Sequence, residues 1–97
     1  MLAHSAAILG YLHAQREPLV AFLGELVRAE SPSSDPGSQS GVRSLLAAQL
    51  EARGFSTRFV AGQATGGHLI ARPRGRRRRA RQQLVIGHYD TVWPVGT

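Results

Sequence analysis

Cysteine is absent from this 97-residue chain, and so is lysine. Without a thiol the chain can form no disulfide, no thiolate metal site and no cysteine nucleophile. All twelve basic residues are arginines, and seven of them fall between Arg72 and Arg81. The formal net charge of +6 is therefore a local feature of one segment and not a property of the whole surface.

Long apolar runs are also missing, so no segment has the length and apolar character of a bilayer-spanning helix. The opening stretch MLAHSAAILGYLHAQRE has no basic region before its apolar residues, and His4 and His13 interrupt them. We therefore expect no secretory signal and a soluble cytoplasmic protein. A chain of 97 residues is long enough for one small domain.

The first part of the chain has the apolar spacing of helices. Ile8, Leu9 and Leu12 predict a helix with one apolar face. Pro18 then indicates a break near Glu17, because proline is tolerated in the first turn of a helix and not in its interior. A second amphipathic stretch follows, with its apolar residues three and four positions apart: Leu19, Phe22, Leu23, Leu26 and Val27.

A loop and a third helical segment come next. Residues 30–40, ESPSSDPGSQS, predict a loop whose last serines can cap the following helix through a side-chain oxygen. That helix is predicted over residues 41–53, and Gly54 stands where a helix needs a left-handed terminating residue. Its apolar face consists of Val42, Leu45, Leu46 and Leu50.

The apolar period then changes from near four to two, which favours strands. Residues 55–60 alternate as a half-buried strand, AGQATGG forms a turn, and residues 68–72 predict a second strand. The short apolar run QLVIG, residues 83–87, predicts a third strand that is covered on both faces. Helices followed by three strands predict an α/β fold with a mixed sheet.

His88 and Asp90 follow the expected third strand. In an extended chain, residues i and i+2 point to the same side, and open α/β sheets bind ligands beyond the carboxyl ends of their strands. A carboxylate beside an imidazole fixes the tautomer of a metal-binding histidine. The pair therefore indicates a metal site with His88 as the ligand. In the alternative interpretation, Asp90 caps a local turn that continues into Thr91.

The segment IGHYDTVWPVGT resembles the zinc-ligand segment of the metallopeptidase family that includes glutamate carboxypeptidase, acetylornithine deacetylase and succinyl-diaminopimelate desuccinylase. In that family an apolar strand ends in Gly- or Ser-His-x-Asp-Thr-Val. LVRAESPSSD, LLAAQLEARGF and GGHLIARPRG resemble, in the same order, its first helix with the following loop, its second helix and the strand before a linker. The resemblance extends from Leu9 to Thr97.

The resemblance implies that residues 1–97 are the incomplete amino-terminal part of a three-layer zinc-peptidase catalytic domain. His88 would be a ligand of one zinc in a two-zinc site, and Asp90 would be the catalytic aspartate that orients His88. The family's other acidic ligands, its Glu–Glu pair and its late histidine have no counterpart in this chain. Cobalt or manganese stay open as alternatives to zinc.

The activity that this family implies is hydrolysis of an amide bond next to a free carboxylate. The substrate would be a small peptide or an acylated amino acid, and the enzyme a carboxypeptidase or an N-acyl-amino-acid deacylase. We expect the full-length protein to be active, with a homodimer as one option, and this 97-residue piece to be inactive.

Other residues suggest competing interpretations. We expect His4 and His13 to be solvated and His68 to have a structural role. The run GRRRRARQ, residues 75–82, is expected to be a solvated loop, with binding of a polyanion such as nucleic acid or anionic lipid as the alternative function. It lacks interleaved aromatic residues for base stacking. A third interpretation is a short protein that binds a partner through an unpaired sheet edge.

Overall fold

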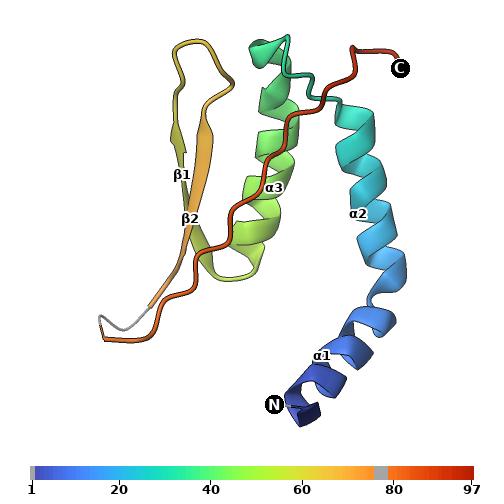
Figure 1. Ribbon diagram of the computed structural model, residues 1–97, viewed down its shortest axis with the longest axis vertical. Coiled ribbons are helices and arrows are strands. Elements are labelled where there is room, and N and C mark those ends of the chain that lie inside the picture. The colour runs from blue at the N-terminus through green and yellow to red at the C-terminus, as the bar shows by residue number, and fades with distance from the viewer. Residues whose placement is uncertain (1, 76–78) are drawn as a thin grey trace.

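The structure, a computed structural model, describes residues 2–75 and 79–97. It is a small α/β fold with three α-helices and one two-stranded antiparallel sheet. The helical elements are α1 (Leu2–Ala14), α2 (Arg16–Ala29), the short 3-10 helix η1 (Pro36–Gln39) and α3 (Ser40–Ala52), and the strands are β1 (Phe55–Val60) and β2 (His68–Pro73). In Figure 1, α3 lies between the hairpin and α2, and the last residues return past all three as extended chain.

The predicted break between the first two helices is confirmed. Helix α1 ends at Ala14 and α2 begins at Arg16, which places Pro18 in the first turn of α2. The first N–H groups of a helix have no partner inside it, so Pro18 removes no hydrogen bond there. The apolar face of the two helices is mostly uncovered, because its larger side chains are between 45% and 65% exposed: Ile8, Leu9, Tyr11, Leu12, Leu19, Val20, Leu23 and Val27.

Helix α3 begins without the serine cap that the sequence predicts. Its N-cap residue is Gln39, which makes no side-chain cap hydrogen bond, while the Ser38 hydroxyl donates to the carbonyl of Asp35. A capping side chain needs a residue with non-helical backbone angles, whereas η1 runs directly into α3 and Ser40 is already helical, with φ −61° and ψ −34°. At the other end the prediction is confirmed, since Gly54 has φ +90°.

The two predicted strands are confirmed as an antiparallel hairpin, with Phe55 opposite Pro73 and Val60 opposite His68. Helix α3 packs against both strands. Val42, at the start of α3, is buried at 3% exposure, and Pro32 is also buried. Other apolar side chains of this layer are half-buried: Leu45, Leu46, Leu50, Phe55, Val60, Leu69 and Ile70.

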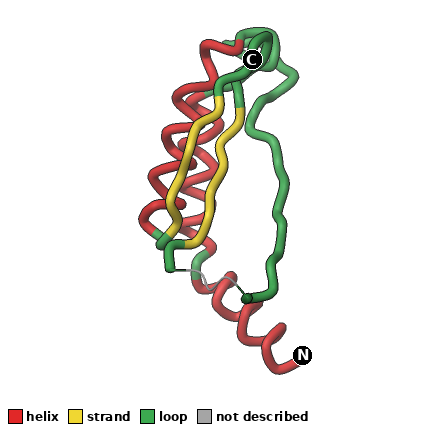
Figure 2. The backbone as a smooth tube through the Cα atoms, turned by 90° about the vertical axis from the view of Figure 1, so that its left-hand side faces the viewer, coloured by secondary structure: helices red, strands yellow, loops and turns green. Residues whose placement is uncertain are grey.

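The third strand that the sequence predicts over residues 83–87 is not formed, and the sheet is therefore not mixed. This segment is extended, but it belongs to no ladder in the described part of the chain. Leu84, Val85 and Ile86 are 84%, 91% and 82% exposed. Figure 2 shows the returning chain standing apart from both strands. A strand needs a neighbour whose backbone groups are within bonding distance, and β2 does not come close enough to supply one.

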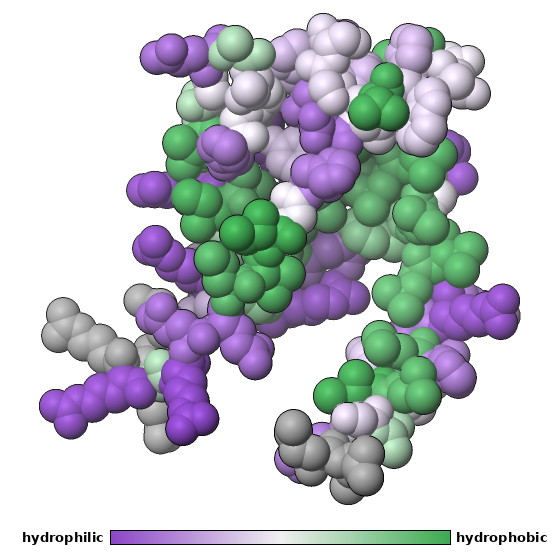
Figure 3. Space-filling view, viewed as in Figure 1, coloured by the Kyte–Doolittle hydropathy of each residue, from purple (hydrophilic) through white to green (hydrophobic). Residues whose placement is uncertain are grey.

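Apolar side chains also gather on the surface. Figure 3 shows them over α1 and α2 and over the returning chain, while hydrophilic side chains project beside the turn that follows β2. None of the helices in residues 2–75 and 79–97 combines the length and the apolar character needed to cross a membrane.

Candidate functional site

Two segments that are far apart in the sequence meet beside α3. The backbone N–H of Ser33 donates to the Thr91 carbonyl at 2.7 Å, and the N–H of Thr91 donates to the Ser31 carbonyl at 2.8 Å. Together these bonds form a parallel bridge in which Pro32 stands opposite Thr91. Proline lacks an N–H, but this bridge takes its donor from Ser33 and its acceptor from Ser31, so Pro32 leaves no bond unmade.

His88 and Asp90 lie on the same side of this bridge and contact each other. The Nδ1 atom of His88 is 3.2 Å from Oδ1 of Asp90 and 3.1 Å from the Asp90 carbonyl oxygen. Both of these oxygens are acceptors, so the hydrogen bond requires the proton to be on Nδ1. In the neutral ring, Nε2 then keeps its lone pair. The side chain of His88 is 85% exposed, and Nε2 is therefore open to a ligand.

The other carboxylate oxygen of Asp90 is also engaged. The Ser33 hydroxyl donates to Oδ2 at 2.7 Å. This hydrogen bond is the main cause that lowers the pKa of Asp90 from its ordinary value of 3.8; desolvation by burial opposes the shift, and the Asp90 backbone and His88 contribute further lowering. Asp90 is therefore an ionised carboxylate at neutral pH. Its negative charge faces the protonated Nδ1 of His88.

Buried polar residues hold the two segments together. Ser31 is 2% exposed, and its hydroxyl donates to the carbonyl of Tyr89. Gln39 is 5% exposed, and its Nε2 donates to the Pro32 carbonyl at 3.1 Å. The Tyr89 hydroxyl donates to the Gly67 carbonyl at 3.1 Å. Each buried polar group thus has a partner, as a stable arrangement of such groups requires.

The turn of the hairpin packs closely on this polar network because it contains glycines. A Cβ on Gly66 would lie 1.9 Å from Oε1 of Gln39, and a Cβ on Gly67 would lie 2.5 Å from the Val60 carbonyl oxygen. Gly67 also has φ +83°, in the left-handed region that side chains disfavour. From α3, the Arg43 guanidinium donates to the Gly66 carbonyl at 3.3 Å, which ties the turn to the helix.

A groove adjoins His88 and Asp90. It has a volume of about 800 Å³ and runs between residues 66–71 on one side and residues 84–90 on the other. One end carries the polar side chains of Ser33, His88 and Asp90, and the remainder is mainly apolar. A groove that combines apolar walls with a few convergent polar groups has the character of a small-molecule site.

The donor set of the site fits one metal ligand and its orienting carboxylate. A catalytic zinc takes about three protein ligands and leaves one position open. No group of three or more histidine, aspartate or glutamate side chains is placed to hold a metal ion within residues 2–75 and 79–97. His88 could supply one ligand through Nε2, whereas a catalytic zinc would need about two more protein ligands.

Of the other histidines, His68 lines the groove beside the His88–Asp90 pair, and His4 and His13 lie on α1. His4 and His13 are exposed on α1, as expected, and His68 is exposed at the start of β2 opposite Val60. Of the arginine run, residues 76–78 lie outside the described residues. The described arginines of this run, Arg79 and Arg81, are exposed, as are Arg72 and Arg74 before it. Polyanion binding stays a prediction.

Sequence reasoning found His88 and Asp90, but it gave no role to Ser33, Ser31 or Gln39. Two signals were available: serines that flank a proline in ESPSS, and the glycine pair before His68. Neither signal says which distant segment these residues meet, so local patterns could not identify the network.

Comparison of the chain with protein-family models, with curated proteins and with solved structures finds no match. The family resemblance therefore remains a hypothesis carried by sequence motifs. The geometry of Ser33, Asp90 and His88 is an independent observation on which a function can be argued.

Proposed function

We propose that this chain forms the amino-terminal part of the catalytic domain of a zinc-dependent amide hydrolase. The observation that carries the proposal is the contact between Nδ1 of His88 and Oδ1 of Asp90, at 3.2 Å, with the other side of the ring open to solvent. Metal-binding histidines commonly donate their second ring N–H to a carboxylate, which fixes the ring and raises its basicity.

In this proposal His88 holds one zinc ion through Nε2. A bound zinc would activate a water molecule and polarise the scissile carbonyl. The ionised Asp90 accepts the proton on Nδ1, so the lone pair of the neutral ring is on Nε2. A small peptide or an acylated amino acid with a free carboxylate would bind beside the pair. The general base and the remaining ligands would come from other residues of the full-length protein, with cobalt or manganese as alternative metals and a homodimer as one assembly.

The uncovered apolar surface supports a larger catalytic domain. Leu84, Val85 and Ile86 are at least 82% exposed, immediately before the proposed ligand. A contiguous run of large apolar side chains in water is unfavourable and typically marks a surface that packs against further protein. The same holds for the uncovered face of α1 and α2. These faces are where the rest of the proposed domain would pack.

The test uses the protein made from the complete reading frame that contains these residues. We expect it to bind zinc and to hydrolyse an N-acyl amino acid or a peptide that ends in glutamate. His88→Ala is expected to lose at least one zinc ion and the activity. Asp90→Asn is expected to lower metal affinity or activity about 10- to 100-fold, as changes beside a ligand do.

His13→Ala is the matched control, because His13 is also exposed but lies on α1, outside the groove. It should keep full zinc content and activity. A complete protein that binds no zinc, or whose hydrolysis survives His88→Ala, would contradict the proposal. The 97-residue chain by itself is expected to be inactive, since it offers one of the ligands that a catalytic zinc needs.

A further inference from the structure

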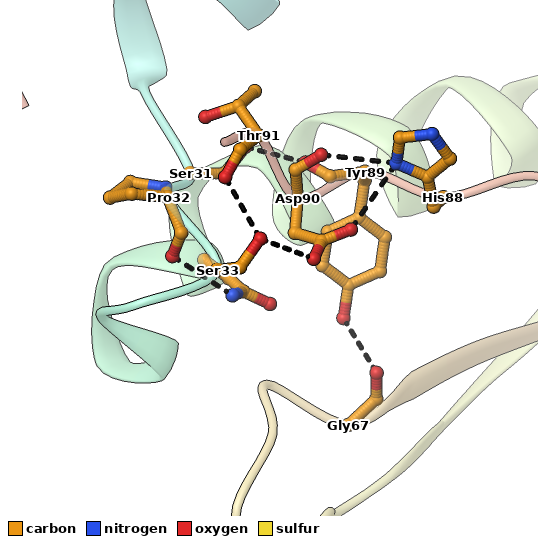
Figure 4. Close-up of polar contacts among 9 residues, drawn as sticks. Ser31, Pro32, Ser33, Gly67, His88, Tyr89, Asp90 and Thr91 are labelled. Atoms are coloured by element: carbon orange, nitrogen blue, oxygen red, sulfur yellow. Dashed lines mark hydrogen bonds and ion pairs between the residues drawn. The ribbon is translucent and has the colours of Figure 1, made fainter. Parts of the chain in front are cut away.

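We propose that Ser33 is the positioning residue of the His88–Asp90 pair: its hydroxyl fixes the plane of the Asp90 carboxylate so that Oδ1 faces Nδ1 of His88. The assignment of this pair to a metal site rests on the proposed function. The positioning itself rests on the contacts of the three side chains, which Figure 4 shows as a continuous chain.

The aspartate side chain needs an external partner to hold its plane. The last torsion of an aspartate is broad and roughly two-fold, so its own rotamer preference does not aim one oxygen at a neighbour. In this site the two oxygens have different partners, since Oδ2 accepts from Ser33 at 2.7 Å and Oδ1 faces His88 at 3.2 Å. The shorter bond to Oδ2 thus sets the direction of Oδ1.

The Ser33 hydroxyl has one proton and two acceptors within reach. The second acceptor is the Thr91 carbonyl, at 2.9 Å. The carboxylate is the stronger acceptor because it is ionised, and a hydrogen bond to an ionised oxygen is shorter and stronger than one to a neutral carbonyl. The Thr91 carbonyl already accepts the Ser33 backbone N–H at 2.7 Å. The hydroxyl proton is therefore committed to Asp90.

The backbone places this hydroxyl independently of the bond it makes. The bridge between residues 31–33 and Thr91 fixes the register of the two segments. The Pro32 carbonyl accepts a hydrogen bond from the side-chain amide of the buried Gln39. The linking of the segments is thus done by main-chain bonds and by the buried Ser31 hydroxyl, whereas the exposed Ser33 side chain is left to act on Asp90. A donor held in place by supporting bonds is what a preorganised site requires.

The test reads the state of the His88 ring directly. The 97-residue chain, labelled with ¹⁵N in its histidine rings, is studied by NMR at about pH 8, where an ordinary imidazole is neutral. The wild-type ring is expected in the Nδ1–H form. Ser33→Ala is expected to move both ring nitrogen shifts of His88 toward the values of Asp90→Ala. Ser33→Thr keeps the hydroxyl and should restore the wild-type shifts, because the exposed position has room for a methyl group.

Two further variants separate positioning from folding. Ser33→Cys keeps the size of the side chain but replaces the hydroxyl by a weak donor, so it should behave as Ser33→Ala and decides the matter if the alanine variant unfolds. Ser31→Ala loses a linking bond but no contact with the carboxylate, so it should move the His88 shifts less than Ser33→Ala does. Unchanged His88 shifts in both the alanine and the cysteine variants, or an equal change in Ser31→Ala, would overturn the proposal.

A second readout separates this proposal from the proposed function. In the complete protein, Ser33→Ala is expected to weaken zinc binding about 10- to 100-fold, with Ser33→Thr close to wild type. A protein that binds no zinc, but whose His88 spectra respond as expected, would refute the zinc hydrolase and leave Ser33 as the positioning residue. Suppose instead that zinc binding is lost in His88→Ala but is unchanged in both Ser33→Ala and Ser33→Cys. This result would refute the positioning role of Ser33 and leave the zinc site in place.

Discussion

Residues 84–87 and residues 88–91 follow each other on one extended segment, yet they are held very differently. The first four belong to no ladder, and Leu84, Val85 and Ile86 are more than four-fifths exposed. Of the next four, Tyr89, Asp90 and Thr91 are bonded to residues 31–33 or to the hairpin turn, and His88 is bonded to Asp90. The difference shows that a strand-like sequence becomes ordered structure only where another segment presents free backbone groups in register.

Near the site, polar side chains are buried and hydrogen-bonded, while the neighbouring apolar side chains are exposed. Ser31 and Gln39 are buried polar residues near the site, whereas the apolar residues Leu84, Val85 and Ile86 are exposed. Hydrogen bonds are directional and fix register, while apolar contact alone leaves many arrangements of similar free energy. A site held by hydrogen bonds can therefore keep its geometry while the apolar surface next to it remains uncovered.

Displacing the hairpin turn is expected to have the largest destabilising effect on residues 88–91 and their contacts. In Gly67→Ala, the new Cβ would lie 2.5 Å from the Val60 carbonyl oxygen at a φ of +83°. Backbone strain and overpacking together should lower the free energy of unfolding by about 2–4 kcal/mol. Urea unfolding measures this, and the NMR signals of Tyr89 should shift because its hydroxyl donates to the Gly67 carbonyl.

Gly54→Ala is the matched control for that change. Gly54 has a similar φ of +90°, but a Cβ there would meet nothing within 4 Å. It should lose only the strain contribution, about 1 kcal/mol. Equal losses in the two variants would mean that the close packing of the turn does not contribute to stability.

A smaller loss is expected from Ser31→Ala. The buried hydroxyl donates to the Tyr89 carbonyl, which the variant leaves without this donor. The free energy of unfolding should fall by about 1–2 kcal/mol, the cost of an unpaired buried polar group. Hydrogen exchange at the Thr91 N–H, which donates to the Ser31 carbonyl, should become faster. Ser38→Ala serves as the control, because that exposed hydroxyl bonds within its own turn; a larger loss there would contradict this account.

A further variant replaces the exposed apolar side chains of residues 84–86 by polar ones. The triple variant Leu84→Ser, Val85→Thr and Ile86→Ser should change the free energy of unfolding by no more than about 0.5 kcal/mol, as exposed substitutions usually do. Self-association should decrease, because the apolar run and its unpaired backbone favour edge-to-edge pairing. Sedimentation and light scattering over a concentration series measure this. A loss comparable to that of Ser31→Ala would show that residues 84–87 are packed in solution.

The features that the sequence predicts correctly are those with a local cause. The break before Pro18, the left-handed Gly54 and the two strands of the hairpin each follow from a few adjacent residues. The missing cap of α3 has a different origin: it depends on η1 continuing into the helix, which serines alone do not reveal. The prediction of a third strand is wrong because an apolar run does not indicate whether a partner strand is present.

In the candidate site, too, the local contact can be predicted from the sequence and the long-range contact cannot. His88 and Asp90 are two residues apart, so their contact can be predicted from extended geometry alone. Ser33 meets Asp90 across 57 positions of sequence, and no periodicity or turn signal encodes that distance. Long-range polar contacts of this kind depend on the whole fold, and the structure was needed to find them.

The smallest expected effect concerns the titration of Asp90, and it tests whether the Ser33 hydroxyl donates to this carboxylate. The pKa of Asp90 is lowered from 3.8, first of all by the Ser33 hydroxyl. A carboxyl whose pKa is lower in the folded chain stabilises that chain fully above its unfolded pKa, and the contribution is lost as the pH falls through the folded pKa. The relevant window therefore lies below pH 3.8. Ser33→Ala should raise the titration midpoint of the Asp90 carboxyl carbon toward 3.8, measured by ¹³C NMR, while Ser33→Thr should leave it low. An unchanged midpoint in Ser33→Ala would mean that the hydroxyl proton bonds the Thr91 carbonyl instead of Asp90.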